Sequence, residues 1–217
     1  EAWLIDLGVF RLRGIPYPER VAQLCHRELP TDFPPLRTGN AGHEPYFPTP
    51  LTSFVGRHAE LTELRRLVDG NRLVTLTGSG GVGKTRLALQ LATEFVDRFR
   101  DGAWCVDLAP ITDPDLLPER VTHMLGLPDR SDRFPVDALV RFIAGRQLLL
   151  VLDNCEHLLD GCAQLTSTLL ATGAELTIVA TSRAPIGVAG EVTWKTPSLS
   201  LLDEAVELFR ERARLVR

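Results

Sequence analysis

Apolar residues are concentrated in four short runs that are separated by intervals too long for hairpins. Each run is predominantly apolar rather than strictly alternating, which is typical of a strand buried on both faces. Such strands, when helices lie between them, predict a parallel sheet with helical crossover connections. The runs cover residues 73–77, 103–108, 148–152 and 176–180.

Two of the segments between these runs have helical periodicity. In residues 85–98 the apolar positions recur at i, i+3, i+4 and i+7, and a shorter helix is expected over roughly residues 116–125. The alternation of strands and helices predicts an α/β fold. The apolar positions of the longer segment are Ala88, Leu91, Ala92 and Phe95.

The pattern on either side of this core predicts three more elements. A helix precedes the first run, with Gly70 as its stop signal, and the alternating residues 191–196 are expected to close the sheet. A last helix is expected to reach the end of the chain, because Ser200 and Asp203 have capping-box spacing. The apolar stripes are Leu61, Leu64, Leu67 and Val68 in the first helix and Leu202, Val206 and Phe209 in the last.

A change in composition separates the first residues from the rest. A strand-like run occupies residues 3–12, whereas residues 29–50 contain six prolines and no periodicity. Because proline lacks an N–H donor and biases its neighbours to extended conformations, this stretch is interpreted as a linker. We expect a short module at 1–29, a linker at 30–50 and the main module at 51–217. The abrupt start and helical end indicate a segment of a longer polypeptide.

Composition narrows the function classes. With 44% hydrophobic and 24% charged residues among 217, the chain is globular, and its net charge of −4 argues against a dominant nucleic-acid-binding surface. The four cysteines form no CxxC pair and are expected to be reduced, buried or half-buried thiols. No apolar stretch reaches membrane-helix length and no signal peptide opens the chain, so a cytoplasmic location without membrane contact is expected.

The stretch GSGGVGKT follows the first apolar run and precedes a helical segment. It matches the GxxxxGK[ST] pattern, in which glycines let backbone N–H groups converge on phosphates at a helix N-terminus. The lysine would reach the β- and γ-phosphates, and the threonine hydroxyl would ligate Mg²⁺. The candidate phosphate-binding residues are Gly78, Ser79, Gly80, Gly81, Val82, Gly83, Lys84 and Thr85.

An acid ends the third apolar run, LLLVLD, and is the candidate metal carboxylate. Asp153 would hold Mg²⁺ directly or through water. Asn154 follows where many ATPases carry a second acid that polarises the attacking water. Glu156, or with less support His157, is a candidate catalytic base, although a first-turn glutamate also favours a helix N-terminus. Arg183 follows the fourth run, and it either contacts the γ-phosphate or is a solvated loop arginine.

Together with FVGR at 54–57, these elements stand in an order that resembles the STAND class of P-loop ATPases, the NB-ARC-like switches of bacterial LuxR- and SARP-type regulators. The resemblance covers residues 51–217 and implies a parallel-sheet P-loop NTPase of ASCE type with about five strands, which binds ATP or ADP with Mg²⁺. It also implies that Val55, Gly56 and Arg57 line the adenine and ribose side, Asp153 serves the metal and Arg183 is the sensor.

The GLPL-type motif, winged helix, helical repeats and helix-turn-helix of that class are not in this chain. DNA contact would therefore depend on a helix-turn-helix elsewhere in the parent protein, and nucleotide-dependent self-association is an open hypothesis. Residues 12–24, LRGIPYPERVAQL, after DLGVFR at 6–11, resemble the closing strands of a class III nucleotide cyclase. The metal-binding aspartates of such cyclases are missing, so no cyclase activity is expected from this chain.

The leading interpretation is a weakly hydrolysing ATP/ADP switch module of a transcriptional regulator. The alternatives are an inactive cyclase tail fused to a P-loop scaffold, a small-molecule P-loop kinase, or an inert scaffold. A kinase would need an arginine-rich lid and an acceptor site. The arginines available for a lid are Arg120, Arg130, Arg133 and Arg141, which form no recognisable pattern.

Overall fold

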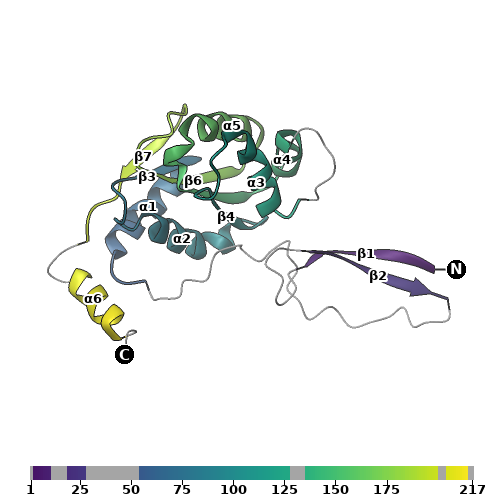
Figure 1. Cartoon of the computed structure of the whole chain (residues 1–217), viewed down its shortest axis with the longest axis horizontal. Helices are drawn as coiled ribbons and strands as arrows, with labels where there is room; N and C mark the ends of the chain where they lie inside the picture. The colour runs from purple at the N-terminus through teal and green to yellow at the C-terminus, as the bar shows by residue number, and fades with distance from the viewer. Residues whose placement is uncertain (1, 11–18, 28–53, 128–134, 200–203, 215–217) are drawn as a thin grey trace.

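The computed structural model describes residues 2–10, 19–27, 54–127, 135–199 and 204–214. Its main part is a five-stranded parallel sheet with helices on both faces, as the α/β prediction required (Figure 1). The strand order is β4-β5-β6-β3-β7, so successive strands are joined by crossovers. The strands are β3 (Leu73–Thr77), β4 (Ala103–Asp107), β5 (Leu148–Asp153), β6 (Leu176–Ser182) and β7 (Val192–Lys195).

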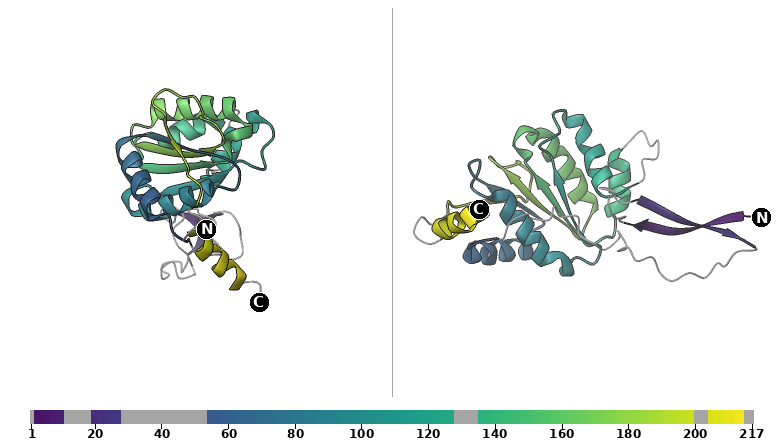
Figure 2. Two further views of the ribbon diagram at one scale, coloured as in Figure 1. Left: turned by 90° about the vertical axis from the view of Figure 1, so that its left-hand side faces the viewer. Right: turned by 60° about the horizontal axis from the view of Figure 1, so that its bottom comes forward.

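Helices cover the sheet on two sides because the side chains of each strand alternate between its faces. On β5, Leu148, Leu150 and Leu152 pack into one cluster with α3, α4 and α5. Leu149 and Val151 pack into the other cluster with α1 and α2. Figure 2 shows that helices lie on both sides of the sheet. The helices are α1 (His58–Gly70), α2 (Lys84–Phe95), α3 (Leu117–Met124), α4 (Pro135–Ile143) and α5 (Leu159–Thr172).

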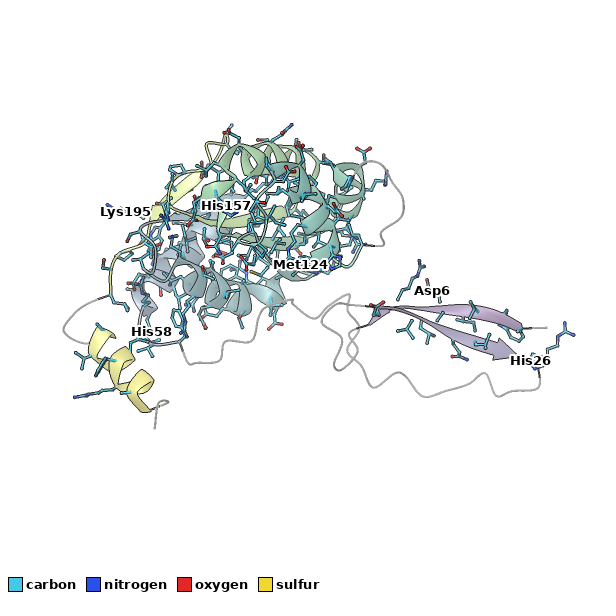
Figure 3. All side chains as sticks on the ribbon, viewed as in Figure 1. Asp6, His26, His58, Met124, His157 and Lys195 are labelled. Atoms are coloured by element: carbon cyan, nitrogen blue, oxygen red, sulfur yellow. The ribbon has the colours of Figure 1, made fainter. Side chains whose placement is uncertain are left out.

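The predicted periodicities correspond to real helices. The apolar stripe of residues 85–98 is buried on α2, although the α-helix ends at Phe95 and a 3-10 turn, η1 (Val96–Arg98), follows it. Residues 191–196 do close the sheet, since β7 pairs with β3 in parallel. Figure 3 shows the packed side chains of this domain, with Met124 on the buried side of α3 and Lys195 at the β7 edge.

The first residues form an antiparallel hairpin of β1 (Ala2–Phe10) and β2 (Glu19–His26). An ion pair between Arg20 and Asp6 joins the two strands at a bulge. The apolar residues Leu4 and Leu24 are 68% and 66% exposed, so this hairpin buries little of its own surface. The turn of the hairpin and the proposed linker at 30–50 lie outside the described residues.

The expected C-terminal helix is present as α6 (Glu204–Arg214). Ser200, Leu202 and Asp203 lie outside the described residues, so the capping box is not among the features seen. Val206 and Phe209 are 42% and 74% exposed, so these two stripe residues are not buried in the described structure.

Burial decides the state of the cysteines. All four thiols are buried, as expected. Burial, together with the nearby carboxylates of Asp153 and Asp107, raises the pKa of the Cys105 thiol to about 12. In the parts that the structure describes, no helix is both long and apolar enough to cross a membrane.

The Cys105 thiol is therefore expected to be inert in the folded protein. Because the thiolate is the reactive species, iodoacetamide at pH 8 should leave Cys105 unmodified in native protein and modify it in guanidinium chloride. Mass spectrometry of tryptic peptides measures both. Rapid native alkylation at Cys105 would show that β4 opens to solvent far more often than its burial indicates.

Candidate functional site

The GSGGVGKT stretch forms the connection between the carboxyl end of β3 and the start of α2. Gly83, with φ of 95°, precedes the first helical residue, and a side chain there would be strained because that φ is left-handed. Gly78 has φ of 148°, and a Cβ there would lie 3.4 Å from the Thr196 carbonyl oxygen. The loop is thus closely packed against the chain that leaves β7.

Lys84 lies under this loop rather than in solvent. Its side chain is buried, and its ammonium donates to the carbonyl oxygens of Gly78 at 2.8 Å and Ser79 at 3.1 Å. Both acceptors are neutral carbonyl oxygens rather than carboxylates. A phosphate oxygen is a stronger acceptor for such a cation than a carbonyl oxygen.

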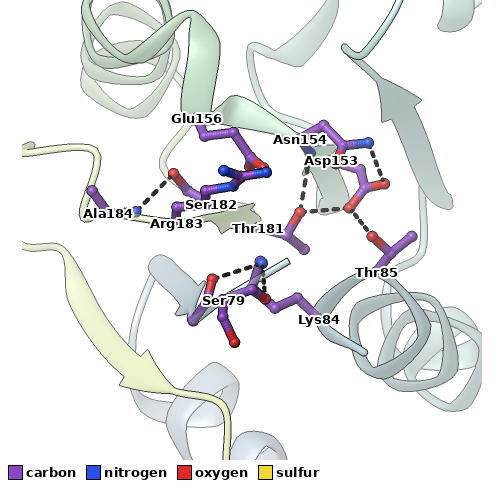
Figure 4. Close-up of polar contacts among 11 residues, drawn as sticks. Ser79, Lys84, Thr85, Asp153, Asn154, Glu156, Thr181, Ser182, Arg183 and Ala184 are labelled. Atoms are coloured by element: carbon purple, nitrogen blue, oxygen red, sulfur yellow. Dashed lines mark hydrogen bonds and ion pairs between the residues drawn. The ribbon is translucent and has the colours of Figure 1, made fainter. Parts of the chain in front are cut away.

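Asp153 lies beside the end of the loop, at the carboxyl end of β5. Its Oδ1 accepts hydrogen bonds from the hydroxyls of Thr85 at 2.8 Å and Thr181 at 2.5 Å (Figure 4). Its Oδ2 accepts from Nδ2 of Asn154 at 3.2 Å. The predicted metal-binding residues, Thr85 and Asp153, are therefore in direct contact.

The Asp153 carboxylate is buried, and its hydrogen-bond donors among the described residues carry no charge. Burial raises the pKa of Asp153 above its ordinary value, the Thr181 and Thr85 hydrogen bonds oppose that rise, and the carboxylates of Asp107 and Glu156 add to it. The donors that contact this carboxylate are all neutral. A divalent cation would relieve this imbalance, so the donor set fits Mg²⁺, which favours carboxylate and hydroxyl oxygens with phosphates as further ligands.

Arg183 and Glu156 contact each other above the loop. Nε of Arg183 lies 3.2 Å from Oε1 of Glu156, which belongs to the 3-10 turn η3 (Cys155–His157). A Cβ on Gly80 would lie 3.5 Å from Nη2 of Arg183, so the guanidinium is next to the loop. Oε2 of Glu156 is buried and accepts no hydrogen bond from the described residues. The predicted sensor and the predicted base are paired.

The segment before α1 supports the same loop. Arg57 is buried, has φ of 59°, and donates from Nη2 to the Val82 carbonyl oxygen at 2.8 Å. Gly56 also has a left-handed φ, of 68°. The two residues turn the chain into α1 so that the Arg57 guanidinium reaches the loop. Val55 is half-buried beside them.

His157, the less favoured base, faces a different loop. Its Nε2 lies 3.1 Å from the Leu108 carbonyl oxygen and 2.7 Å from that of Ile111. Since it donates to at least one of these carbonyls, it serves to fix the connection after β4. Glu156 remains the candidate base of the sequence analysis, and Nε2 of His157 is engaged at the connection after β4.

Two residues of the site were not singled out by the sequence patterns. Thr181 is buried in β6, and its hydroxyl donates to Asp153. Oγ1 of Thr181 also accepts a hydrogen bond from the backbone N–H of Asn154 at 3.0 Å. Asp107 ends β4 and is paired in register with Asp153. Its Oδ1 accepts from Nδ2 of Asn154 at 3.1 Å. The strand-ending position that drew attention to Asp153 was also a usable signal for Asp107.

A separate cavity of about 330 Å³ lies along α3, between the apolar side chains of Ile111, Leu116 and Leu127. Arg120 also lines it and donates from Nε to the Asp107 carbonyl oxygen at 3.4 Å. Arg120 is therefore held at the end of β4 rather than in the glycine loop. Of the four arginines considered for a lid, Arg130 and Arg133 lie outside the described residues.

A glycine loop between a buried strand and a helix, in a parallel sheet with crossovers, defines a P-loop nucleoside triphosphatase fold. More specifically, the chain belongs to the AAA domain family, whose family model matches residues 65–188. A Mycobacterium tuberculosis protein provisionally named as an HTH-type transcriptional regulator, Rv0890c, is 56% identical over 154 residues. That match covers 71% of this chain and 17% of the relative.

A second M. tuberculosis relative, Rv0894, is 51% identical over 167 residues, which are 77% of this chain and 42% of the relative. This chain thus spans less than half of either protein. Among solved structures, the fold is similar to the ORC2 protein of Aeropyrum pernix, with a TM-score of 0.53, 16% identity and coverage of 76% of this chain and 53% of that one.

The fold is also similar to a STAND protein with a tetratricopeptide repeat sensor from Pyrococcus horikoshii. The TM-score is 0.51 and the identity 18%, over 76% of this chain and 26% of that one. At such identities the two likenesses concern the fold.

Replacing Asp153 is expected to stabilise the nucleotide-free protein. Because its pKa is raised on folding, ionised Asp153 lowers stability at neutral pH, and this effect disappears as the pH falls below the ordinary value of 3.8. Asp153→Asn should therefore raise Tm at pH 7.5, by about 2 to 4 °C per kcal/mol regained, with a smaller gain at lower pH. Scanning calorimetry measures this against the exposed control Asp137→Asn; a lower Tm for Asp153→Asn contradicts it.

Proposed function

We propose that this domain binds ATP and ADP together with Mg²⁺ and acts as a nucleotide-dependent switch in a multidomain transcriptional regulator. The observation that carries the proposal is the 2.8 Å contact between Thr85, at the end of the glycine loop, and the buried carboxylate of Asp153. A hydroxyl and an acid at this place form the metal-binding half of a P-loop site. The lysine of the phosphate-binding half is Lys84.

In this proposal the residues divide the work of binding. Backbone N–H groups of residues 78–85 and the Lys84 ammonium hold the phosphates, while Thr85 and Asp153 hold the cation. The cation, when bound, neutralises phosphate charge that builds up as the terminal bond breaks. Val55, Gly56 and Arg57 are assigned to the adenine and ribose side, next to the loop that Arg57 supports.

The switch is assigned to the ion pair of Arg183 and Glu156. Arg183 is 69% exposed on its side chain and lies next to Gly80, so a terminal phosphate competes with Glu156 for it. An exposed ion pair contributes little stability. A terminal phosphate, which carries more negative charge than a carboxylate, is a stronger partner for the Arg183 guanidinium. Release of Glu156 would leave its carboxylate to accept a proton from the attacking water.

Slow hydrolysis follows from the residue after Asp153. Asn154 cannot accept a proton as a carboxylate does, and its amide is already shared between Asp107 and Asp153. Glu156 can act as a base only after its ion pair with Arg183 has opened, so it is available for only part of the time. ATP would then persist long enough to act as a signal, and its conversion to ADP would reset the state.

The setting of the switch is also a proposal. The name of the Rv0890c relative supports a regulator that contacts DNA through a helix-turn-helix outside these residues. We assign residues 1–29 to the end of a cyclase-like domain, residues 30–50 to a linker and residues 51–217 to the nucleotide-binding module of a LuxR- or SARP-type protein. We also propose that the domain associates with a second copy of itself in a nucleotide-dependent manner.

Lys84→Ala is expected to abolish tight nucleotide binding. The substitution removes the only lysine near the phosphates in the loop, and hydrogen bonds to charged groups contribute about 1.5 to 3 kcal/mol, or at least about 10-fold in affinity. Isothermal titration with ATP and ADP in Mg²⁺ measures the loss. Arg100→Ala, which removes an exposed cation on the β4 side, should bind as wild type; equal binding by Lys84→Ala and wild type would refute the proposal.

Arg183→Ala is expected to weaken ATP binding by about 10-fold and to leave ADP binding almost unchanged, because only ATP carries the phosphate that Arg183 is proposed to contact. Competition titrations give both affinities. Glu156→Gln is the matched control, since it removes the other member of the pair but keeps the cation. It should keep or raise ATP affinity, because Glu156 no longer competes with the terminal phosphate for Arg183, and it should lower turnover. An equal loss for ATP and ADP in Arg183→Ala would exclude the sensor role.

A further inference from the structure

Thr181 is the one buried hydroxyl in the described structure that joins Asp153 to the backbone of the turn that follows it. The residue is 1% exposed and lies near the carboxyl end of β6, the strand between β5 and β3. Its hydroxyl donates to Oδ1 of Asp153 at 2.5 Å. The same oxygen accepts the backbone N–H of Asn154 at 3.0 Å. One side chain thus fixes both the carboxylate and the residue after it.

These contacts determine how the carboxylate is oriented. Oδ1 receives two hydroxyl donors, from Thr85 and Thr181, and Oδ2 receives the amide of Asn154. A carboxylate held at both oxygens by three donors from different elements cannot rotate without losing at least one of them. Because the donors are neutral, they fix the direction of the group and leave its charge for a cation.

The surroundings of Thr181 also connect this carboxylate to Arg183. Leu176–Ser182 is a strand with almost every residue buried, and Arg183 follows it directly. The Asn154 backbone takes a left-handed conformation, with φ of 65°, and its N–H is directed to Thr181. Asn tolerates this conformation better than most residues do. The metal side and the sensor side of the site are therefore held by one strand.

We propose that Thr181 is a positioning residue that holds Asp153 in the orientation required for a divalent cation bound with the nucleotide. This inference rests on the proposed function and goes beyond it, since it assigns to a residue of β6 the part of the nucleotide affinity that depends on Mg²⁺. Thr181 acts through Asp153 and does not itself contact the cation. Phosphate binding by the glycine loop and Lys84 is independent of it.

The test compares ATP affinity with Mg²⁺ and with EDTA. The Mg²⁺ effect is the ratio of the two dissociation constants, measured by titration calorimetry on the 217-residue chain. Thr181→Val keeps the shape and removes the hydroxyl, and Thr181→Ser restores it. Thr166→Val is the matched control, because Thr166 is equally buried on α5 and its Oγ1 has no hydrogen-bond partner in the described structure.

We expect the Mg²⁺ effect to fall by about 10-fold or more in Thr181→Val, as for other partners that orient metal ligands, while affinity in EDTA is kept. Thr181→Ser and Thr166→Val should retain the wild-type ratio. A wild-type ratio in Thr181→Val overturns the inference and leaves the proposed function intact. ATP binding by wild type without any Mg²⁺ effect overturns it as well, and absence of ATP binding in wild type overturns both proposals.

Folding of the variants is followed by thermal unfolding without nucleotide. If Thr181→Val does not fold, Thr181→Ala takes its place, because alanine also lacks the hydroxyl donor. A wild-type Mg²⁺ effect in folded Thr181→Ala overturns the inference, and a reduced effect supports it. A purely structural role would lower Tm and leave the ratio unchanged, so the ratio separates the two roles.

Discussion

The site depends on one unfavourable fact, which is that Asp153 is only 4% exposed and that its hydrogen-bond donors among the described residues are neutral hydroxyl and amide groups. Such a group persists because hydroxyl and amide donors from α2, β6 and the turn after β5 converge on it. The sheet supplies the geometry, since the carboxyl ends of parallel strands lie at one edge. Without this convergence, a buried acid would either take up a proton or open the fold.

The two cations near this acid are engaged elsewhere. Lys84 donates to carbonyl oxygens of its own loop, and Arg183 pairs with Glu156. Each has a partner that a phosphate oxygen can replace, because neutral carbonyls and an exposed ion pair are weaker partners than a phosphate. In the described structure, neither Lys84 nor Arg183 donates a hydrogen bond to Asp153. Under the proposed function, the phosphates of a nucleotide would contact Lys84 and Arg183, and a divalent cation would contact Asp153.

How much could be predicted depended on whether a feature is local in sequence. Apolar positions in a buried strand or an amphipathic helix recur within a few residues, so β3 to β6 and α2 could be located from the sequence. The GSGGVGKT pattern marked the loop. The AAA family model, which matches residues 65–188, agrees with that reading. The pairing of Glu156 with Arg183, 27 positions apart, depends on the order of strands in the sheet. The same is true of Thr181, whose hydroxyl reaches the Asp153 carboxylate because β6 lies next to β5 in the sheet.

The chain that leaves β7 passes directly beside the glycine loop. The Thr196 N–H donates to the Thr77 carbonyl oxygen at 2.7 Å, and the Thr196 carbonyl faces Gly78. This peptide unit therefore joins the chain after β7 to the first residue of the glycine loop, so a displacement of either one changes the backbone packing of the other.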